Sequence, residues 1–357
     1  MENIEEIIQS IRKPDEAARL ASRRRWDSLA KPLGSLGLLE TAVTDIAALR
    51  GDADVRLDKR TLLVFCADNG VVQEGVSQCG SEVTARVAVA LAEGRSSVSP
   101  MARLAGCEVL PVDMGMLDFP GHPGVLDLRM QNGTGDISLG PAMQREGCLH
   151  AVESGAALAR RLAEEGTDIM LVGEMGIGNT TTAAAVAAAL LKLPPEAVAG
   201  RGAGLSDAGL KRKRAVIARA LSLNAPDASD PIDVLAKLGG LDLAAMCGAF
   251  LGAAGARIPA VVDGFISAVA ALCALRLCPE ARSAMLASHL SAEPAALSVQ
   301  QALGVQAPIS AGLHLGEGSG AVALLPLLDL ALSVYHSGQT FDKLGIAAYV
   351  PQDGKSC

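Results

Sequence analysis

Three glycine-rich segments carry the residues that can do chemistry. The first, GEMGIGNTTT at residues 173–182, joins an apolar run to an Ala-rich helical pattern. Glycines let the backbone approach a ligand, and the N–H groups of a helix's first turn, aided by its dipole, bind anions. We therefore expect a phosphomonoester here. Because the segment is neither GxxxxGK[ST] nor GxGxxG, it does not indicate a nucleoside triphosphate or a dinucleotide. The alternative is that Asn179 and the threonines only cap the helix.

The second segment, GRGAGLSDAGLKRKR at residues 200–214, again leads from a loop into a helix, with Ser206 and Asp207 as the expected N-cap. Residues 211–214 place four cations around one helical turn, so they cannot all face the same ligand. We expect Lys213 to be the one that approaches a phosphate, as a point charge. The alternative is a basic face that only meets solvent.

The third segment, AGLHLGEGSGA at residues 311–321, sets Glu317 between two glycines, after an apolar run and before an apolar helix. Small neighbours let a substrate approach this carboxylate, which makes Glu317 a candidate general base. The alternative is an acidic residue that favours a helix start. In SHLSAEP at residues 288–294 no GxSxG elbow marks a nucleophile, so we expect His289 and Glu293 to position a ligand or loops and do not expect a hydrolase triad.

Six short apolar runs alternate with longer helical patterns, which is typical of βαβ units and a parallel sheet. The runs are residues 61–67, 107–112, 167–172, 258–262, 283–287 and 307–311. Each of the six runs is followed, at once or within a few residues, by polar and Gly residues. These residues form the motifs DNG, DMG, GEMG, DG, SH and GEG, in the order of the runs. Ligands of open α/β sheets bind outside the carboxyl ends of the strands, so we expect one ligand crevice here, although Gly and Asp are also ordinary turn residues.

Helical patterns occupy both ends of the chain. Residues 1–60 predict two or three amphipathic helices broken at KPLGSLG, residues 31–37, and residues 321–336 predict an apolar helix that docks beside them. The core must be built from small and aliphatic side chains, because the chain has only one Trp, two Tyr and five Phe. Such a composition suits helices packed closely on a parallel sheet.

Charge and composition exclude several classes of protein. A net charge of -8 and a pI near 5.2 provide no basic field for nucleic acid. The start of the chain has no apolar signal region, and the longest uncharged apolar stretch, residues 243–256, is shorter than the roughly 20 residues of a membrane helix, so we expect a cytoplasmic protein. The eight Cys form no CxxC pair and the five His no HExxH motif, so we expect most cysteines in the core and no metal.

Taken together, the segments resemble the nicotinate-nucleotide:dimethylbenzimidazole phosphoribosyltransferase family over nearly the whole chain. The motifs that carry the resemblance are KPLGSLG (31–37), DNGVVQEGVS (68–77), GEMGIGNTT (173–181), GRGAG (200–204), GGLDLAAM (239–246), VDGFI (262–266), SH (288–289) and LGEGSG (315–320). GEMGIGNTT and LGEGSG in this order are the most specific of them.

The resemblance implies an α/β fold: a Rossmann-like, mostly parallel sheet of about six strands flanked by helices, with a small helical domain from both termini. We place the small domain at residues 1–60 plus 321–357 and the large catalytic domain at 61–320. The resemblance also implies a homodimer. The expected partners are small molecules, nicotinate mononucleotide and a benzimidazole-type base, without nucleic acid, membrane, metal or other cofactor.

The resemblance implies that Glu317 is the general base that accepts the proton of the acceptor's ring N–H. It places Glu174, Gly176 and Lys213 at the mononucleotide and Asp263 near its ribose or base. The expected substrate-binding residues are Glu174, Met175, Gly176, Ile177, Gly178, Asn179, Thr180, Arg201, Gly202, Lys213, Asp263, Ser288, His289, Ser291 and Leu315, and the expected acceptor pocket contains Asp68, Ser77, Cys79 and Val87.

One departure bears on the acceptor. After GVS at residues 75–77 the family often has an aromatic residue followed by Pro, whereas this chain has Gln78, Cys79 and Gly80. We therefore keep open a pocket that accepts purines or phenols as well as, or instead of, 5,6-dimethylbenzimidazole. Two other functions stay open: a subunit that binds or regulates through nicotinate mononucleotide without turnover, and a nucleosidase that transfers the ribosyl group to water.

Overall fold

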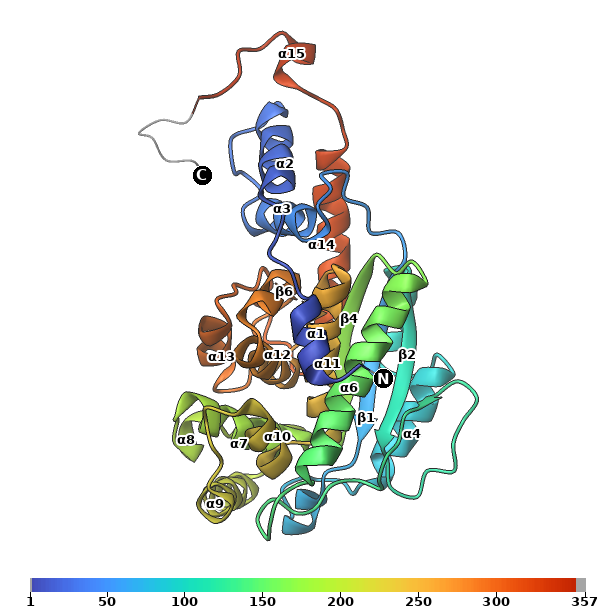
Figure 1. The fold of residues 1–357 in the computed structure, drawn as a ribbon, viewed down its shortest axis with the longest axis vertical. Helices are drawn as coiled ribbons and strands as arrows, with labels where there is room; N and C mark the ends of the chain where they lie inside the picture. Colours follow the sequence, from blue (N-terminus) through green and yellow to red (C-terminus); the bar gives the residue numbers. More distant parts are fainter. Residues whose placement is uncertain (1, 351–357) are drawn as a thin grey trace.

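A six-stranded parallel sheet forms the centre of the molecule (Figure 1). The structure is a computed structural model and describes residues 2–350. Its strands are β1 (Arg60–Ala67), β2 (Cys107–Gly115), β3 (Leu126–Asp127), β4 (Ile169–Met175), β5 (Ala260–Val262) and β6 (Met285–Ala287). The strand order is β3-β2-β1-β4-β5-β6, and every pair is parallel. The order reverses between β1 and β4, so the carboxyl ends of these two strands flank the point at which α/β sheets bind ligands.

Five of the six predicted strands are confirmed, and the sixth is wrong. Residues 307–311 form no strand, because Pro308 has no N–H to donate and only Ile309 makes an isolated bridge, to His289. The remaining strand of the sheet, β3, was not predicted from the sequence, because a strand of two residues is too short to show a pattern. β4 also continues to Met175, so Glu174 belongs to a strand and not to the turn after it.

Helices cover both faces of the sheet, because alternate side chains of its strands point into two separate cores. The helices are α1 (Ile4–Ser10), α2 (Glu16–Ser28), α3 (Leu38–Arg50), α4 (Glu82–Ala92), α5 (Val98–Leu104), α6 (Arg145–Glu164), α7 (Asn179–Leu191), α8 (Pro195–Val198), α9 (Asp207–Asn224), α10 (Pro231–Leu238), α11 (Leu241–Ala256), α12 (Phe265–Leu277), α13 (Ala296–Leu303), α14 (Ser319–Tyr335) and α15 (Phe341–Leu344), with 3-10 turns η1 (Gly70–Glu74) and η2 (Pro279–Ala284). Leu63 and Phe65 of β1 belong to the core that includes α6, α7, α11 and α12, while Leu62 and Val64 belong to the core that includes α3, α4, α5 and α14.

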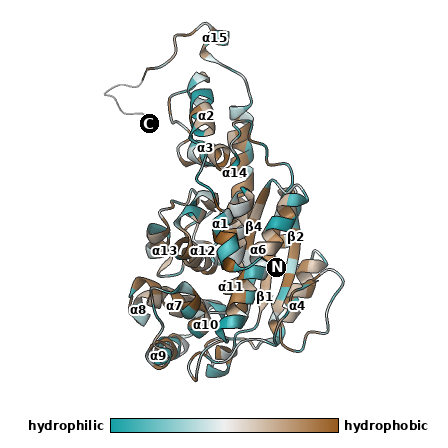
Figure 2. Ribbon diagram, viewed as in Figure 1, coloured by the Kyte–Doolittle hydropathy of each residue, from teal (hydrophilic) through white to brown (hydrophobic). Residues whose placement is uncertain are grey.

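Helices α6 and α11 pack backbone against backbone, which explains the scarcity of aromatic residues. A Cβ atom added at Gly155 would lie 1.9 Å from the carbonyl oxygen of Ala245, and one added at Gly248 would lie 1.7 Å from that of Val152. Helix α11 is buried on nearly all sides, whereas α6 carries hydrophilic residues on its outer side (Figure 2). Small residues therefore let this layer approach the sheet closely.

The C-terminal helix α14 docks beside the N-terminal helices, as predicted. The rings of Trp26 in α2 and Tyr335 in α14 lie 4.8 Å apart, and the Tyr335 hydroxyl donates to the Ala53 carbonyl at 2.8 Å and lies 3.1 Å from Ser22 Oγ. Helix α1 lies elsewhere, against α6 and α11. The division into domains 1–60 plus 321–357 and 61–320 stays a prediction, and its residues 351–357 lie outside the described part of the chain.

Most cysteines are small core residues, as expected. Cys66, Cys107, Cys148, Cys247, Cys273 and Cys278 are buried, and Cys79 is half-buried. Cys357 lies outside the described residues. Within residues 2–350 no helix is long and apolar enough to cross a membrane.

Candidate active site

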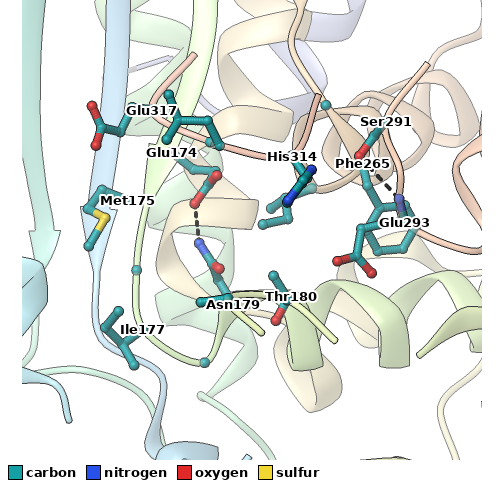
Figure 3. A pocket seen from close by; sticks show the side chains of 18 of the residues that line it. Glu174, Met175, Ile177, Asn179, Thr180, Phe265, Ser291, Glu293, His314 and Glu317 are labelled. Atoms are coloured by element: carbon teal, nitrogen blue, oxygen red, sulfur yellow. Dashed lines mark hydrogen bonds between the residues drawn. The ribbon is translucent and has the colours of Figure 1, made fainter. Parts of the chain in front are cut away.

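A cavity of about 290 Å³ lies at the carboxyl ends of β4, β5 and β6, beside the point where the strand order reverses (Figure 3). It brings together all three glycine-rich segments. The predicted residues that line it are Ser77, Val87, Glu174, Met175, Gly176, Ile177, Gly178, Asn179, Thr180, Arg201, Gly202, Asp263, His289, Ser291, Leu315 and Glu317. Residues more than 200 positions apart thus meet at one edge of the sheet.

Four predicted residues lie outside the lining, each for a visible reason. Lys213 is buried behind Thr180, and Ser288 lies behind His289, with its hydroxyl donating to the Val262 carbonyl at 2.7 Å. The Asp68 carboxylate is held by the Thr84 hydroxyl at 2.6 Å and the Leu117 N–H at 2.8 Å. Cys79 lies next to the lining, with Sγ 3.7 Å from Ser77 Oγ.

Asp68 acts on the cavity through Thr84. The Thr84 hydroxyl donates to Asp68 and accepts the N–H of Ile177 at 3.1 Å, so the carboxylate of β1's end holds the loop that follows β4. Burial raises the pKa of Asp68, although these hydrogen bonds oppose the shift. Asp68 therefore supports the glycine-rich loop from beneath instead of facing a ligand.

One end of the cavity is cationic. Lys213 in α9 is completely buried, and its Nζ donates to Thr180 Oγ1 at 2.8 Å. Burial lowers the pKa of Lys213 to about 8, against the opposing charge of Glu293. Lys211 and Arg212 point to solvent, and Arg212 binds the Gly75 carbonyl at 3.1 Å. Helical geometry thus turns Lys213 inward and leaves Lys211 and Arg212 outside.

Helix α7 begins at this end without a side-chain cap. Gly178, at φ 94°, is its N-cap residue and provides no side chain. The alternative that Asn179 and the threonines cap the helix is therefore wrong. Asn179 turns towards buried carboxylates, and Thr180 accepts from Lys213. The first turn of α7 thus faces the cavity beside a buried cation, an arrangement that suits an anion.

The other end of the cavity is acidic. Burial, together with the charges of Asp242, Asp263 and Glu317, raises the pKa of Glu174 to about 8, and the hydrogen bond from Asn179 opposes the shift. Burial likewise raises the pKa values of Asp242 and Asp263 to about 6. The Asn179 amide donates to Glu174 and, at 3.2 Å, to Asp242. Burial, and after it repulsion from the neighbouring carboxylates, therefore favours the protonated form of Glu174.

Glu317 reaches the cavity from a strained loop. Its φ is 58°, between Gly316 at 84° and Gly318 at 78°, so three consecutive residues adopt a left-handed conformation that costs energy only at Glu317. Its N–H donates to the Glu174 carbonyl at 3.2 Å, and its carboxylate accepts the Val98 N–H at 3.0 Å. Such strain persists because α5 and β4 hold the residue on both sides.

Asp263 anchors the same loop. Its carboxylate accepts the Ala321 N–H at 2.8 Å and is further stabilised by backbone N–H groups of Gly318 and Gly320, so it caps the start of α14. His289 packs directly on Gly320, where an added Cβ would lie 1.9 Å from the ring's Nδ1. The ends of β5 and β6 therefore fix the position of Glu317.

Several lining residues were missed by sequence reasoning. They are Val76, Gln78, Ala203, Leu205, Gly264, Phe265, Ile266, Ser267, His314 and Gly316. Most lie within or next to the motifs quoted above, so adjacency was the available signal. Glu293, expected to position a ligand, lines the cavity. In residues 2–350 no group of three or more His, Cys, Asp or Glu is arranged to hold a metal ion.

Comparisons with known proteins agree with this architecture. A family model described as phosphoribosyltransferase matches residues 11–346. The nicotinate-nucleotide–dimethylbenzimidazole phosphoribosyltransferase of Acetivibrio thermocellus is 43% identical over 330 residues, which cover 92% of this chain and 94% of the relative. The protein of the same name from Halalkalibacterium halodurans is 41% identical and covers 99% of both chains.

A solved structure has the same fold. The crystal structure of CobT from Thermus thermophilus matches with a TM-score of 0.87 and 39% identity, over 93% of this chain and 100% of that one. Identity at this level over nearly the whole length extends the likeness from the fold to the family. The chain therefore belongs to the nicotinate-nucleotide–dimethylbenzimidazole phosphoribosyltransferase family.

Proposed function

We propose that this protein transfers the 5-phosphoribosyl group of nicotinate mononucleotide to 5,6-dimethylbenzimidazole or a related base, giving α-ribazole 5'-phosphate and nicotinate. This reaction activates the lower ligand of cobalamin. The observation that carries the proposal is the polarity of the cavity, with buried Lys213 behind one end and Glu317 at the other. A donor with an anionic phosphate and a cationic ring matches this polarity.

The phosphate binds at the cationic end in this proposal. The phosphate is surrounded by the N–H groups at the start of α7, by Thr180 and by Gly202. Lys213 neutralises part of its charge. A Cβ atom added at Gly202 would lie 3.7 Å from Lys213 Nζ, which supports the short approach between this loop and the ammonium group. Arg201 provides a second cation at the cavity wall.

The donor needs little acid catalysis. Its ring nitrogen is already a pyridinium cation. When the bond between C1' and this nitrogen breaks, the electron pair moves to the nitrogen, and the ring leaves with a neutral nitrogen. Positive charge then develops on C1' and the ribose oxygen. The carboxylates of the acidic end stabilise that charge, and alignment of the partners contributes the rest of the rate.

The acceptor is where a base is needed. One ring nitrogen of the benzimidazole attacks C1' with its lone pair, and the proton of the other nitrogen passes to the Glu317 carboxylate and then to solvent. Attack from the face opposite nicotinate inverts the β linkage to α. Val76, Val87, Met175 and Leu315 provide apolar cavity wall for the flat base.

The roles of the individual residues are part of this proposal. Glu317 is the general base, and residues 174–180, Arg201, Gly202, Lys213, Asp263, His289, Ser291 and Leu315 bind or position the donor, with Ser288 behind His289. Ser77 and Val87 face the acceptor, while Asp68 and Cys79 act beside the lining. The scheme draws on no metal or redox cofactor. We further propose a cytoplasmic homodimer.

Acceptor choice is tested by competition. The half-buried Cys79 stands where the family often has an aromatic residue, which supports a pocket that also admits purines or phenols. Supplying 5,6-dimethylbenzimidazole, adenine and phenol at equal concentrations and separating the products measures the preference directly. Exclusive use of dimethylbenzimidazole would end the hypothesis of a broader pocket.

Nicotinate release tests the function as a whole. Purified protein is incubated with nicotinate mononucleotide, with and without 5,6-dimethylbenzimidazole, alongside Glu317→Ala. The proposal requires release that depends on the acceptor and falls strongly in the variant. Release without acceptor would identify a nucleosidase, and no release with any azole or phenol would identify a binding subunit.

A further inference from the structure

One motif of the chain has no place in the chemistry proposed above. GGLDLAAM, residues 239–246, leads into helix α11, and none of these eight residues lines the cavity. Its aspartate, Asp242, is nevertheless completely buried, in a helix that is otherwise built of small and apolar residues. An isolated carboxylate is costly to bury, so its presence here indicates a partner that depends on it. The inference that follows deepens the proposed function and rests on it.

The partner of Asp242 is the side-chain amide of Asn179. Two neutral donors hold the Asp242 carboxylate: the Leu243 N–H donates to Oδ1 at 2.9 Å, and Asn179 Nδ2 donates to Oδ2 at 3.2 Å. The same nitrogen also donates to Glu174 Oε2, a contact drawn in Figure 3. An amide nitrogen carries two hydrogens, so each of the two acidic side chains receives one of them.

Asp242 decides which end of this amide faces Glu174. A protonated carboxyl group both donates and accepts, so neutral Glu174 alone would bind either the nitrogen or the oxygen of Asn179. A carboxylate only accepts, so ionised Asp242 binds only the nitrogen. Burial raises the pKa of Asp242 to about 6 and that of Glu174 to about 8, so Asp242 ionises first as pH rises. The direction of the Asn179 amide therefore follows from Asp242.

Two glycines bring the backbone against this pair of side chains. A Cβ atom added at Gly176 would lie 3.0 Å from Asp242 Oδ2 and 3.3 Å from Asn179 Nδ2. A Cβ atom added at Gly240 would clash with Asp242 and would lie 2.6 Å from Asn69 Oδ1. The loop after β4 thus packs directly on the contact between Asp242 and Asn179, and the glycines of both motifs make room for that contact.

The arrangement leaves Glu174 with one oxygen for the reaction. Its Oε2 receives the hydrogen of Asn179, whereas its Oε1 lies on the side of the Glu317 loop, where a Cβ atom added at Gly316 would be 3.0 Å away. The proton of neutral Glu174 therefore belongs to Oε1. Because Glu174 lines the cavity at its acidic end, the direction of this carboxyl group matters where positive charge develops on C1'.

We propose that Asp242 is a positioning residue, which acts on the substrate only through Asn179 and Glu174. Its carboxylate holds the amide nitrogen of Asn179 towards Glu174, so that one oxygen of Glu174 is fixed and the other is left for the reacting atoms. This role explains why an aspartate is retained in a buried, apolar helix that has no contact with the cavity.

Other ionisable groups also face Glu174 or Asp242, and the test keeps all of them unchanged. They are Cys66 of β1, Asp68 at the end of β1, Asp263 after β5, His289 after β6, and His314 and Glu317 in the loop before α14. Burial raises the pKa of the Cys66 thiol, which keeps it neutral. A change that follows substitution of Asp242 alone is therefore due to Asp242.

Infrared difference spectroscopy of the free protein at pH 7 tests the position of the amide. The C=O stretch of a protonated carboxyl group reports its hydrogen bonding, and the band of Glu174 is the one that Glu174→Gln removes. We expect Asp242→Ala to move this band to higher frequency, because Asn179 is then free to turn and Oε2 loses its donor. Asn179→Ala should move the band equally, and the double variant no further.

The charge of Asp242 gives a second readout, which also serves if Asp242→Ala does not fold. Asp242→Asn keeps the volume and an oxygen for Asn179 but removes a negative charge, which favours the ionised form of Glu174. The Glu174 band should therefore disappear at a lower pH than the midpoint of about 8 expected for the wild type. Asp113→Asn is the matched control, because Asp113 is a buried aspartate at the end of β2 outside the cavity lining, and it should leave the midpoint unchanged.

In the transfer reaction we expect Asp242→Ala to lower kcat about 10-fold, with the KM for nicotinate mononucleotide changed less than about 3-fold. Asp242→Asn, which retains an acceptor for Asn179, should lower kcat less than about 3-fold. A role in packing alone would leave the frequency and the midpoint of the Glu174 band unchanged.

The spectroscopic and kinetic outcomes separate this inference from the proposed function. An unchanged band frequency in Asp242→Ala, an unchanged midpoint in Asp242→Asn, or a kcat of Asp242→Ala equal to that of the wild type would overturn the inference while transfer by the wild type continued. If the wild type transferred nothing, the proposed function would fail, and the two infrared measurements would still decide whether Asp242 positions Glu174.

Discussion

The two ends of the cavity are built in opposite ways. At the cationic end a single buried ammonium, Lys213, has a hydroxyl partner in Thr180, and the rest of the site is backbone and glycine. At the acidic end four carboxyl groups, Glu174, Asp242, Asp263 and Glu317, share hydrogen bonds with one amide and several N–H groups. Burial makes the charge at each end costly in the free protein.

The difference between the two ends shows how the cavity selects its ligand by charge. Burial lowers the pKa of Lys213 and raises that of Glu174, so burial disfavours the charged form of each group in the free protein, and a ligand of opposite sign offsets that cost. A phosphate favours the ammonium form of Lys213, and a cationic ring or C1' favours the ionised form of Glu174. Stability is thus lower in the free protein because the site is complementary to its ligand.

The largest expected effect is at the acidic end, in Glu317→Gln. Without a base for the acceptor's proton, kcat falls by about 10²–10⁴-fold while the KM for the mononucleotide changes little. Steady-state rates of nicotinate release measure the change, and the circular dichroism spectrum verifies the fold. A kcat within about 3-fold of wild type would remove Glu317 from the role of general base.

At the cationic end, Lys213→Met raises the KM for nicotinate mononucleotide by about 10–100-fold. The same change stabilises the free protein, by on the order of 2 kcal/mol, because it removes a buried charge. The pKa of Lys213 is lowered to about 8 from 10.5, so the penalty is complete below pH 8 and fades as pH rises towards 10.5. Melting temperatures at pH 7 and pH 10 should show a gain only at pH 7.

Glu174→Gln tests the acidic end through stability. The pKa of Glu174 is raised from 4.5 to about 8, so the wild type loses stability relative to the variant as pH rises from 4.5 to 8. We expect a gain on the order of 3 kcal/mol for the variant at pH 8 and none near pH 4.5, read from urea unfolding. A pH-independent difference would mean that packing, not ionisation, is responsible.

The smallest effect is expected beneath the cavity, in Thr84→Val. The change removes a buried hydroxyl that links Asp68 to the Ile177 N–H, and we expect a loss of about 1–3 kcal/mol in the free energy of unfolding. The KM for the mononucleotide should rise only a few-fold, because the loop is displaced but its ligand groups remain. Thr41→Val, on the exposed side of α3, provides the control. An unchanged free energy of unfolding would mean that Asp68 does not support the loop through Thr84.

Sequence patterns predicted the strands that carry the site better than the residues that support it. The apolar runs of β1, β2, β4, β5 and β6 and the glycine-rich segments after them are local features, and they appear where predicted. β3 has only two residues and was missed, while residues 307–311 resembled a strand but contain Pro308. A local pattern cannot tell whether an extended segment has neighbours to pair with.

Residue types and spacing by themselves determined the parallel α/β class, the use of small residues in the core, and the three segments from which the cavity is built. Only the tertiary structure decided which polar groups face the ligand. Asp68 and Glu174 both stand at strand ends, yet Thr84 and Leu117 hold Asp68 beneath the loop while Glu174 opens into the cavity. The physical reason is that burial and hydrogen-bond partners come from residues far away in the chain, and these set the charge and direction of each side chain.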